Sequence, residues 1–66
     1  MIDKNALRAE IVRNGMTQKQ LAAQLGISEQ TFTDRMKKGN FTLIEAEQMI
    51  NILKIKNPQK IFFAKG

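Results

Sequence analysis

Three glycines, Gly15, Gly26 and Gly39, divide most of this sequence into short segments. Each glycine follows an amphipathic run of residues. Helices commonly end with one residue in the left-handed conformation, which glycine adopts without steric cost. We therefore expect several short helices joined by tight turns, and no long helix.

Signals for the start of a helix follow the glycines. Thr17 with Gln20, and Thr42 with Glu45, have the spacing of a capping box, in which each side chain accepts a hydrogen bond from the other residue's backbone N–H. Ser28 is a good N-cap for the helix between them. An apolar residue precedes each cap and has an apolar partner five positions later, as in a hydrophobic staple: Met16 with Leu21, Ile27 with Phe32 and Phe41 with Ala46.

These stops and starts predict an all-α fold, a compact five-helix bundle. The expected helices span about 3–14, 18–25, 29–38, 43–53 and, as a short turn opened by Asn57 and Pro58, 58–63. No segment alternates with a period of two, so no strand is expected. One domain, 1–66, would share a core of Leu7, Ile11, Leu21, Ala22, Leu25, Phe32, Met36, Ala46, Met49, Ile50 and Leu53, with Ile27 and Phe41 in the turns.

The composition narrows the classes of function. The chain has no cysteine and no histidine, which removes thiolate metal sites and the commonest general base. We therefore expect no enzyme, no cofactor, no metal and no small-molecule ligand. Eleven Lys and Arg against six Asp and Glu give a net charge of +5, typical of a polyanion binder but also of an ordinary solvated surface. Because no apolar run has transmembrane length and no signal peptide is visible, a cytoplasmic location without a membrane partner is expected.

Residues 17–38 are the most informative segment. Ala22 is small enough for the next helix to cross closely, and Gly26 permits a positive φ at the turn. Two helices joined in this way meet at about 90–120°. The segment therefore predicts a helix-turn-helix motif, which holds its second helix ready to enter a DNA groove.

The outer face of the helix at 29–38 is polar. When Phe32 and Met36 point inward, the opposite face carries hydrogen-bonding side chains and no apolar one. A glutamine can bond adenine, a carboxylate can accept from cytosine, and a threonine methyl can touch thymine. The predicted base-reading residues are Ser28, Glu29, Gln30, Thr33 and Asp34. The alternative is an ordinary solvated face.

The two ends of the motif are expected to bind phosphate. The free N–H groups and positive dipole end of the helix at 18–25 suit an anion, and two lysines end the helix at 29–38. The predicted phosphate contacts are Thr17, Gln18, Lys19, Lys37, Lys38, Asn40 and Thr42. The alternative for the two neighbouring lysines is a favourable charge at a helix C-terminus.

The run TQKQLAAQLGISEQTF resembles the helix-turn-helix of the lambda-repressor/Cro-like family, also called the xenobiotic-response-element family. The matching positions are Gln18, Leu21, Ala22, Gly26, Ile27, Ser28 and Phe32. The resemblance implies a five-helix bundle over essentially the whole chain. It also implies a phosphate contact by Gln18 and base contacts by Ser28, Glu29, Gln30 and either Thr33 or Asp34. Met36 and Gly39 lie one position later than in the commoner form, so the second motif helix should be one residue longer.

The apolar run Ile61, Phe62 and Phe63 is too compact for one small turn to bury. At least one ring should stay exposed, and clustered exposed aromatics mark interfaces. The resemblance also implies dimerisation through this end. The predicted homodimer interface comprises Ile52, Ile55, Phe62 and Phe63. The alternative is a tail that folds back over the first and fourth helices.

Together these features predict a sequence-specific regulator of transcription that binds a double-stranded DNA operator with the helix at 29–38 in the major groove. The resemblance and the short length favour a Cro-like repressor of a bacteriophage or mobile element. The alternative is an antitoxin-like or other protein-interaction module, whose basic face binds an acidic protein partner.

Overall fold

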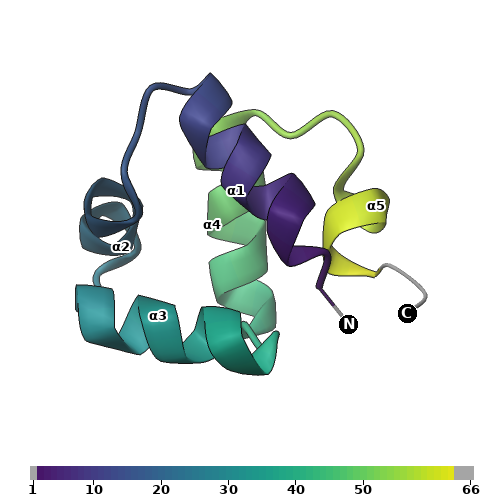
Figure 1. The fold of residues 1–66 in the computed structure, drawn as a ribbon. Helices are drawn as coiled ribbons and strands as arrows, with labels where there is room; N and C mark the ends of the chain where they lie inside the picture. Colours follow the sequence, from purple (N-terminus) through teal and green to yellow (C-terminus); the bar gives the residue numbers. More distant parts are fainter. Residues whose placement is uncertain (1, 64–66) are drawn as a thin grey trace.

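A computed structural model describes residues 2–63, which fold as five helices (Figure 1). The helices are α1 (Lys4–Arg13), α2 (Gln18–Leu25), α3 (Glu29–Lys38), α4 (Leu43–Leu53) and α5 (Pro58–Phe62). The predicted all-α fold is therefore confirmed, and no helix end differs from its expected position by more than one residue. The described part of the chain contains no strand, and none of its helices has the length and apolar character needed to cross a membrane.

The predicted helix starts are confirmed in detail. Thr17 accepts from the Gln20 N–H at 3.1 Å, and the Gln20 side chain accepts from the Thr17 N–H at 2.9 Å. Thr42 forms the second capping box in the same way. One start differs from expectation. Asn57 occupies the N-cap position of α5 but makes no side-chain capping bond, so Pro58, with its fixed φ, opens that helix.

The core lies where all five helices meet. All predicted helix residues of the core are buried except Ile50, which is partly buried, as are Ile27 and Phe41 in the turns. Phe32 is fully buried. The centroids of the Phe32 and Phe41 rings lie 5.3 Å apart, and the ring planes make an angle of 57°. The sequence reasoning missed three further core residues near the C-terminus: Ile55, Ile61 and Phe62.

The end of the chain packs against its beginning. The Asp3 N–H donates to the Ile61 carbonyl at 2.7 Å, and α5 contacts α1 and lies beside it in Figure 1. The alternative of a folded-back tail is therefore confirmed as far as its packing on α1 is concerned, and Ile61 and Phe62 are buried there. Phe63 stays 65% exposed, which confirms the expectation that one ring would remain outside.

Candidate nucleic-acid interface

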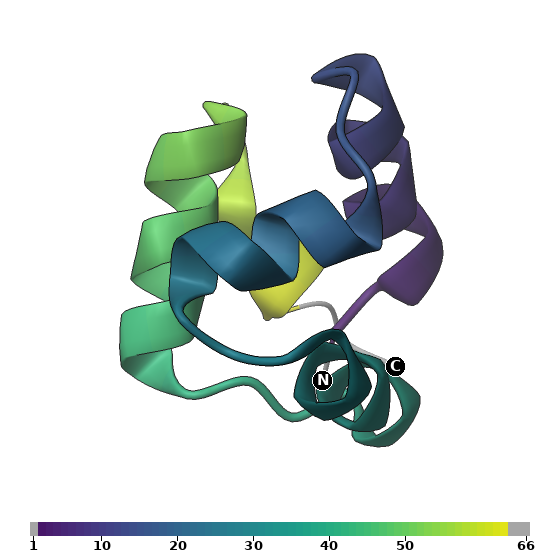
Figure 2. The ribbon, with the colours of Figure 1, turned by 90° about the vertical axis from the view of Figure 1, so that its left-hand side faces the viewer.

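The turn between α2 and α3 sets the direction of α3. Gly26 has a φ of 76°, and the Ile27 N–H donates to the Ala22 carbonyl at 3.0 Å. Ala22 is almost completely buried, as expected for a small residue at a close crossing. The two helices cross steeply: α2 is seen end-on where α3 lies across the view, and the reverse holds after the quarter turn (Figures 1 and 2).

The outward face of α3 is polar, as predicted. Phe32 and Met36 hold the inner face in the core. The side chains of Glu29, Gln30 and Asp34 are exposed, and the Gln30 Nε2 donates to the Asp34 Oδ1 at 3.2 Å. This bond holds an amide and a carboxylate together, one helical turn apart, on the surface of the helix. Such a pair presents both donors and acceptors to a base edge.

The remaining two predicted base contacts differ in availability. Thr33 is half-buried at the side of this face. Ser28 is exposed, but its hydroxyl accepts from the Thr31 N–H at 3.1 Å and donates to the Thr31 Oγ1 at 2.9 Å. Its oxygen therefore caps α3 and its proton is donated to the Thr31 side chain, which leaves Ser28 only an acceptor lone pair for another partner.

The start of α2 leaves a specific pair of donors free. The capping box uses the N–H groups of Thr17 and Gln20. The N–H groups of Gln18 and Lys19, which lie between them, make no hydrogen bond to the residues that the structure describes. Both groups sit at the positive end of the helix dipole, where an anion is stabilised. Of the predicted contacts here, these two are the better placed, because the hydroxyl of Thr17 is occupied.

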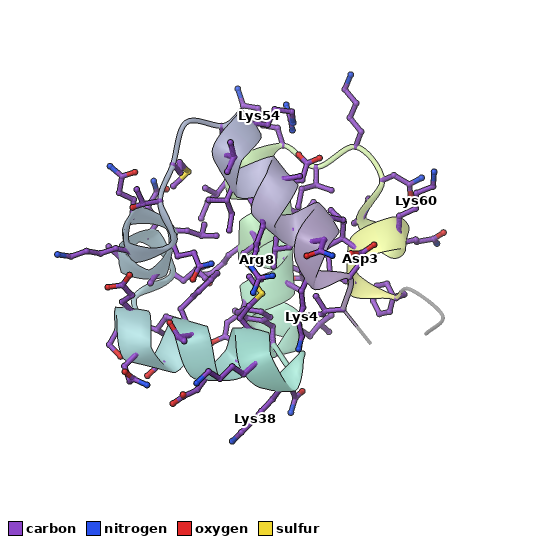
Figure 3. All side chains as sticks on the ribbon, viewed as in Figure 1. Asp3, Lys4, Arg8, Lys38, Lys54 and Lys60 are labelled. Carbon is purple, nitrogen blue, oxygen red and sulfur yellow. The ribbon has the colours of Figure 1, made fainter. Side chains whose placement is uncertain are left out.

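The end of α3 gathers positive charge. Lys37 and Lys38 are exposed, and Lys38 points away from the body of the molecule (Figure 3). The Nζ of Lys4, from α1, donates to the carbonyl of Lys37 at 2.7 Å. Asn40 and Thr42 are exposed just beyond, although the Thr42 hydroxyl caps α4. The sequence offers no local signal for Lys4, because its partner lies 33 positions away.

An ion pair joins α3 to α4. Arg35 donates from its Nη1 to the Oε2 of Glu45, while the Oε1 of Glu45 accepts from the Thr42 N–H at 2.9 Å. Glu45 is 7% exposed and is the one buried charged residue among residues 2–63. The sequence analysis did not predict this ion pair, although Arg35, three positions after the inward-facing Phe32, was a signal for it.

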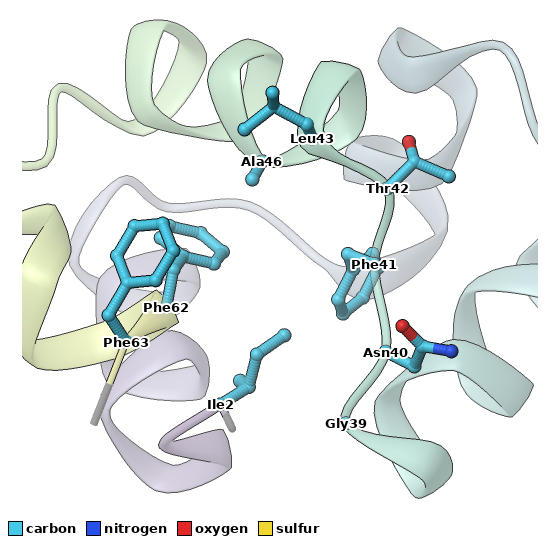
Figure 4. Close-up of a pocket in the computed structure, with 9 residues that line it drawn as sticks. All are labelled: Ile2, Gly39, Asn40, Phe41, Thr42, Leu43, Ala46, Phe62 and Phe63. Atoms are coloured by element: carbon cyan, nitrogen blue, oxygen red, sulfur yellow. The ribbon is translucent and has the colours of Figure 1, made fainter. Parts of the chain in front are cut away.

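The residues predicted for a dimer interface are not equally accessible. Ile55 and Phe62 are buried within the monomer, Ile52 is half-buried, and Phe63 is exposed. Phe63 borders a groove of about 290 Å³ that runs between α5 and the segment connecting α3 to α4 (Figure 4). Leu43, 69% exposed, lines the same groove. The exposed apolar surface at this end thus centres on Phe63 and Leu43.

Comparison with known proteins identifies a family to which part of the chain is similar. The model of the family described as winged helix-turn-helix DNA-binding matches residues 2–38, which include α1, α2 and α3. After the matched region the described chain continues as two further helices, α4 and α5. Neither the search of curated proteins nor that of solved structures found a match.

Proposed function

Because the chain belongs to the winged helix-turn-helix DNA-binding family, we propose that it is a regulator of transcription that reads a specific double-stranded DNA sequence with α3. The observation that supports this most is the division of α3 into a buried apolar face and an exposed polar one, with Gln30 and Asp34 paired on the outside. A helix held so firmly from behind can present side chains to base edges in a fixed register.

The proposed base contacts and the proposed phosphate contacts lie on different parts of the surface. The first two turns of α3 carry the proposed base contacts: Ser28, Glu29, Gln30, Thr33 and Asp34. Phosphate contacts flank them. At one side are the free N–H groups of Gln18 and Lys19 with Thr17; at the other are Lys37, Lys38, Asn40 and Thr42. Contacts of the second kind position a protein on DNA without reading its sequence.

The proposed type of regulator is a Cro-like repressor of a bacteriophage or mobile element, acting in a bacterial cytoplasm. The arrangement of five short helices around one core supports this type and a single domain over 1–66. Such a protein represses by occupying an operator and blocking polymerase.

The proposed active form is a homodimer that joins through the groove beside Phe63. Burial of Phe62 and Ile55 limits their part to supporting the surface from within. The groove lining contains no charged side chain. Two copies, each with a net charge of +5, could therefore meet there without repulsion between like charges in the contact. The expected result is a concentration-dependent dimer mass in sedimentation, lost in Phe63→Ala. A wild-type mass that stays monomeric at all concentrations, both free and on DNA, would contradict the dimer.

The proposed function is tested by selecting duplexes from a random DNA library with the purified protein, followed by sequencing. We expect an enriched consensus, palindromic if two copies bind together, with affinity that falls steeply as salt rises. A pool without enrichment would contradict the proposal even if binding were sensitive to salt, because phosphate contacts alone produce such sensitivity.

A further inference from the structure

A second groove lies on another side of the molecule, between α1 and the segment that carries α5. It has a volume of about 420 Å³. Ala6, Ile55 and Ile61 contribute apolar surface to it, and Arg13, Lys56 and Lys60 contribute cations. Pockets of about 300–1,000 Å³ hold drug-sized groups, so this volume accommodates a few side chains of a partner.

The charges around the groove are unbalanced. Arg13 is held in place by Glu10 and by the Leu53 carbonyl, to which its Nη2 donates at 3.2 Å. Lys56 and Lys60 are exposed and form no salt bridge within residues 2–63. Three cations thus surround the groove with the single carboxylate of Glu10, already paired, among them. The groove combines apolar surface with an excess of positive charge.

The groove is separate from the face assigned to DNA. In Figure 3, Lys60 lies on α5 at the side opposite to α2, and Lys38 projects from α3 on the far edge of the molecule. Figure 1 shows the segment between α4 and α5 at the end of the bundle remote from α3. None of the residues that line the groove belongs to α2 or α3.

We propose that this groove binds an acidic amphipathic segment of a partner protein, with its apolar side chains against Ala6 and the small exposed parts of Ile55 and Ile61, and its carboxylates beside Lys56 and Lys60. Charge complementarity favours this occupant over a second copy, which would bring further positive charge. A nucleic acid strand fits less well, because the lining has no aromatic side chain on which bases could stack. The partner would thus reach the protein while α3 remains free for DNA.

The test selects peptides from a displayed random 12-residue library on the purified full chain. Two double variants are compared: Lys56→Glu/Lys60→Glu in the groove and Lys37→Glu/Lys38→Glu on α3. They are matched, because each lowers the formal net charge by four. We expect winning peptides with Asp or Glu between Leu, Ile or Phe. Their affinity should fall about tenfold in the groove variant, the effect of two ion pairs, and change little in the α3 variant.

Three results would overturn the proposal: no enriched peptide, winners without acidic residues, or equal loss of affinity in both double variants. Circular dichroism of each variant verifies that it folds. As a second measurement, amide shifts on adding the winning peptide should change at Ala6, Ile55 and Lys60; changes confined to α2 and α3 would also overturn it. Failure of the DNA-binding proposal is separately visible, because the duplex selection uses no peptide and the groove variant should keep the duplex preference.

Discussion

The two ends of α3 are built differently. At its start, Gly26 turns the chain, Ile27 packs behind it and Ser28 caps the helix, all within a few residues of one another. At its end, the helix is tied to distant parts of the chain. Lys4 reaches the Lys37 carbonyl from α1, and Arg35 pairs with Glu45 of α4.

The difference matters because the two ends carry different proposed tasks. The start holds the side chains assigned to bases, which need a fixed register, and the turn at Gly26 and the cap at Ser28 add local contacts to the core packing of Phe32. The end holds Lys37 and Lys38, assigned to phosphates, and its position depends on the packing of α1 and α4. We infer that the position of the base-contacting side chains depends mainly on local contacts, and that the position of the phosphate-contacting lysines depends on the packing of the whole bundle. The variants below test this comparison.

The largest effect is expected at the end of α3. Glu45→Ala removes the partner of Arg35 and half of the capping box of α4, so the free energy of unfolding should fall by about 2–4 kcal/mol. Urea denaturation measures it. Glu45→Gln can keep the bond to the Thr42 N–H and should lose less. If Glu45→Ala destabilised no more than Glu10→Ala, which breaks the exposed pair with Arg13, the special role of the α3–α4 pair would be wrong.

A smaller loss of stability is expected from a change at the start of α3. Gly26→Ala forces a residue with a Cβ to a φ of 76°, which costs about 1–2 kcal/mol. No atom lies within 4 Å of the new Cβ, so the loss is conformational and not a clash. Gly15→Ala is a matched control with a φ of 66° and equally open surroundings. Both variants should have lower melting temperatures, and weaker discrimination between DNA sites should be confined to Gly26→Ala. Equal DNA behaviour would contradict local control of register.

Removing the N-cap of α3 is a milder change at the start of the same helix. Ser28→Ala deletes the bond to the Thr31 N–H and should destabilise the protein by about 1 kcal/mol. Ser28→Asp keeps an acceptor at the cap and should be nearly neutral in thermal denaturation. Equal stability of wild type and Ser28→Ala would show that the cap contributes nothing.

The smallest effect is expected from the lysine of α1. Lys4→Met removes a cation from the last turn of α3, worth about 0.3–1 kcal/mol at low salt. Arg8→Met removes another cation of α1, whose contact is Asn5 in the same helix, and serves as the control. Denaturation at low and at high salt should separate them, with a salt-dependent loss for Lys4→Met alone. The same loss in both variants would argue against the contact with Lys37.

The same contrast explains what could be predicted from the sequence. The turns at Gly26 and Gly39 and the capping boxes at Thr17 and Thr42 depend on residues a few positions apart, so they were predictable. The Lys4–Lys37 contact was not, because nothing near either residue indicates a partner 33 positions away.

The C-terminal segment shows the same limit. The spacing of Ile61, Phe62 and Phe63 predicts that one ring stays outside, but which ring depends on how α5 docks on α1. Ile55 follows the last periodic position of α4, so no helical pattern marked it as core. Within the candidate interface, the polar outer face followed from the inward positions of Phe32 and Met36. Bonds such as that between Gln30 and Asp34 needed side-chain geometry.

The most direct test of the central claim compares Gln30→Ala and Lys38→Ala on the selected duplex and its single-base-pair variants, over a range of salt. We predict that Gln30→Ala loses about 1–3 kcal/mol of discrimination at one base position. Lys38→Ala should weaken all duplexes about equally and reduce the salt slope by about one unit. If both variants lost the same affinity on every sequence, the division of α3 into a base-contacting start and a phosphate-contacting end would be contradicted.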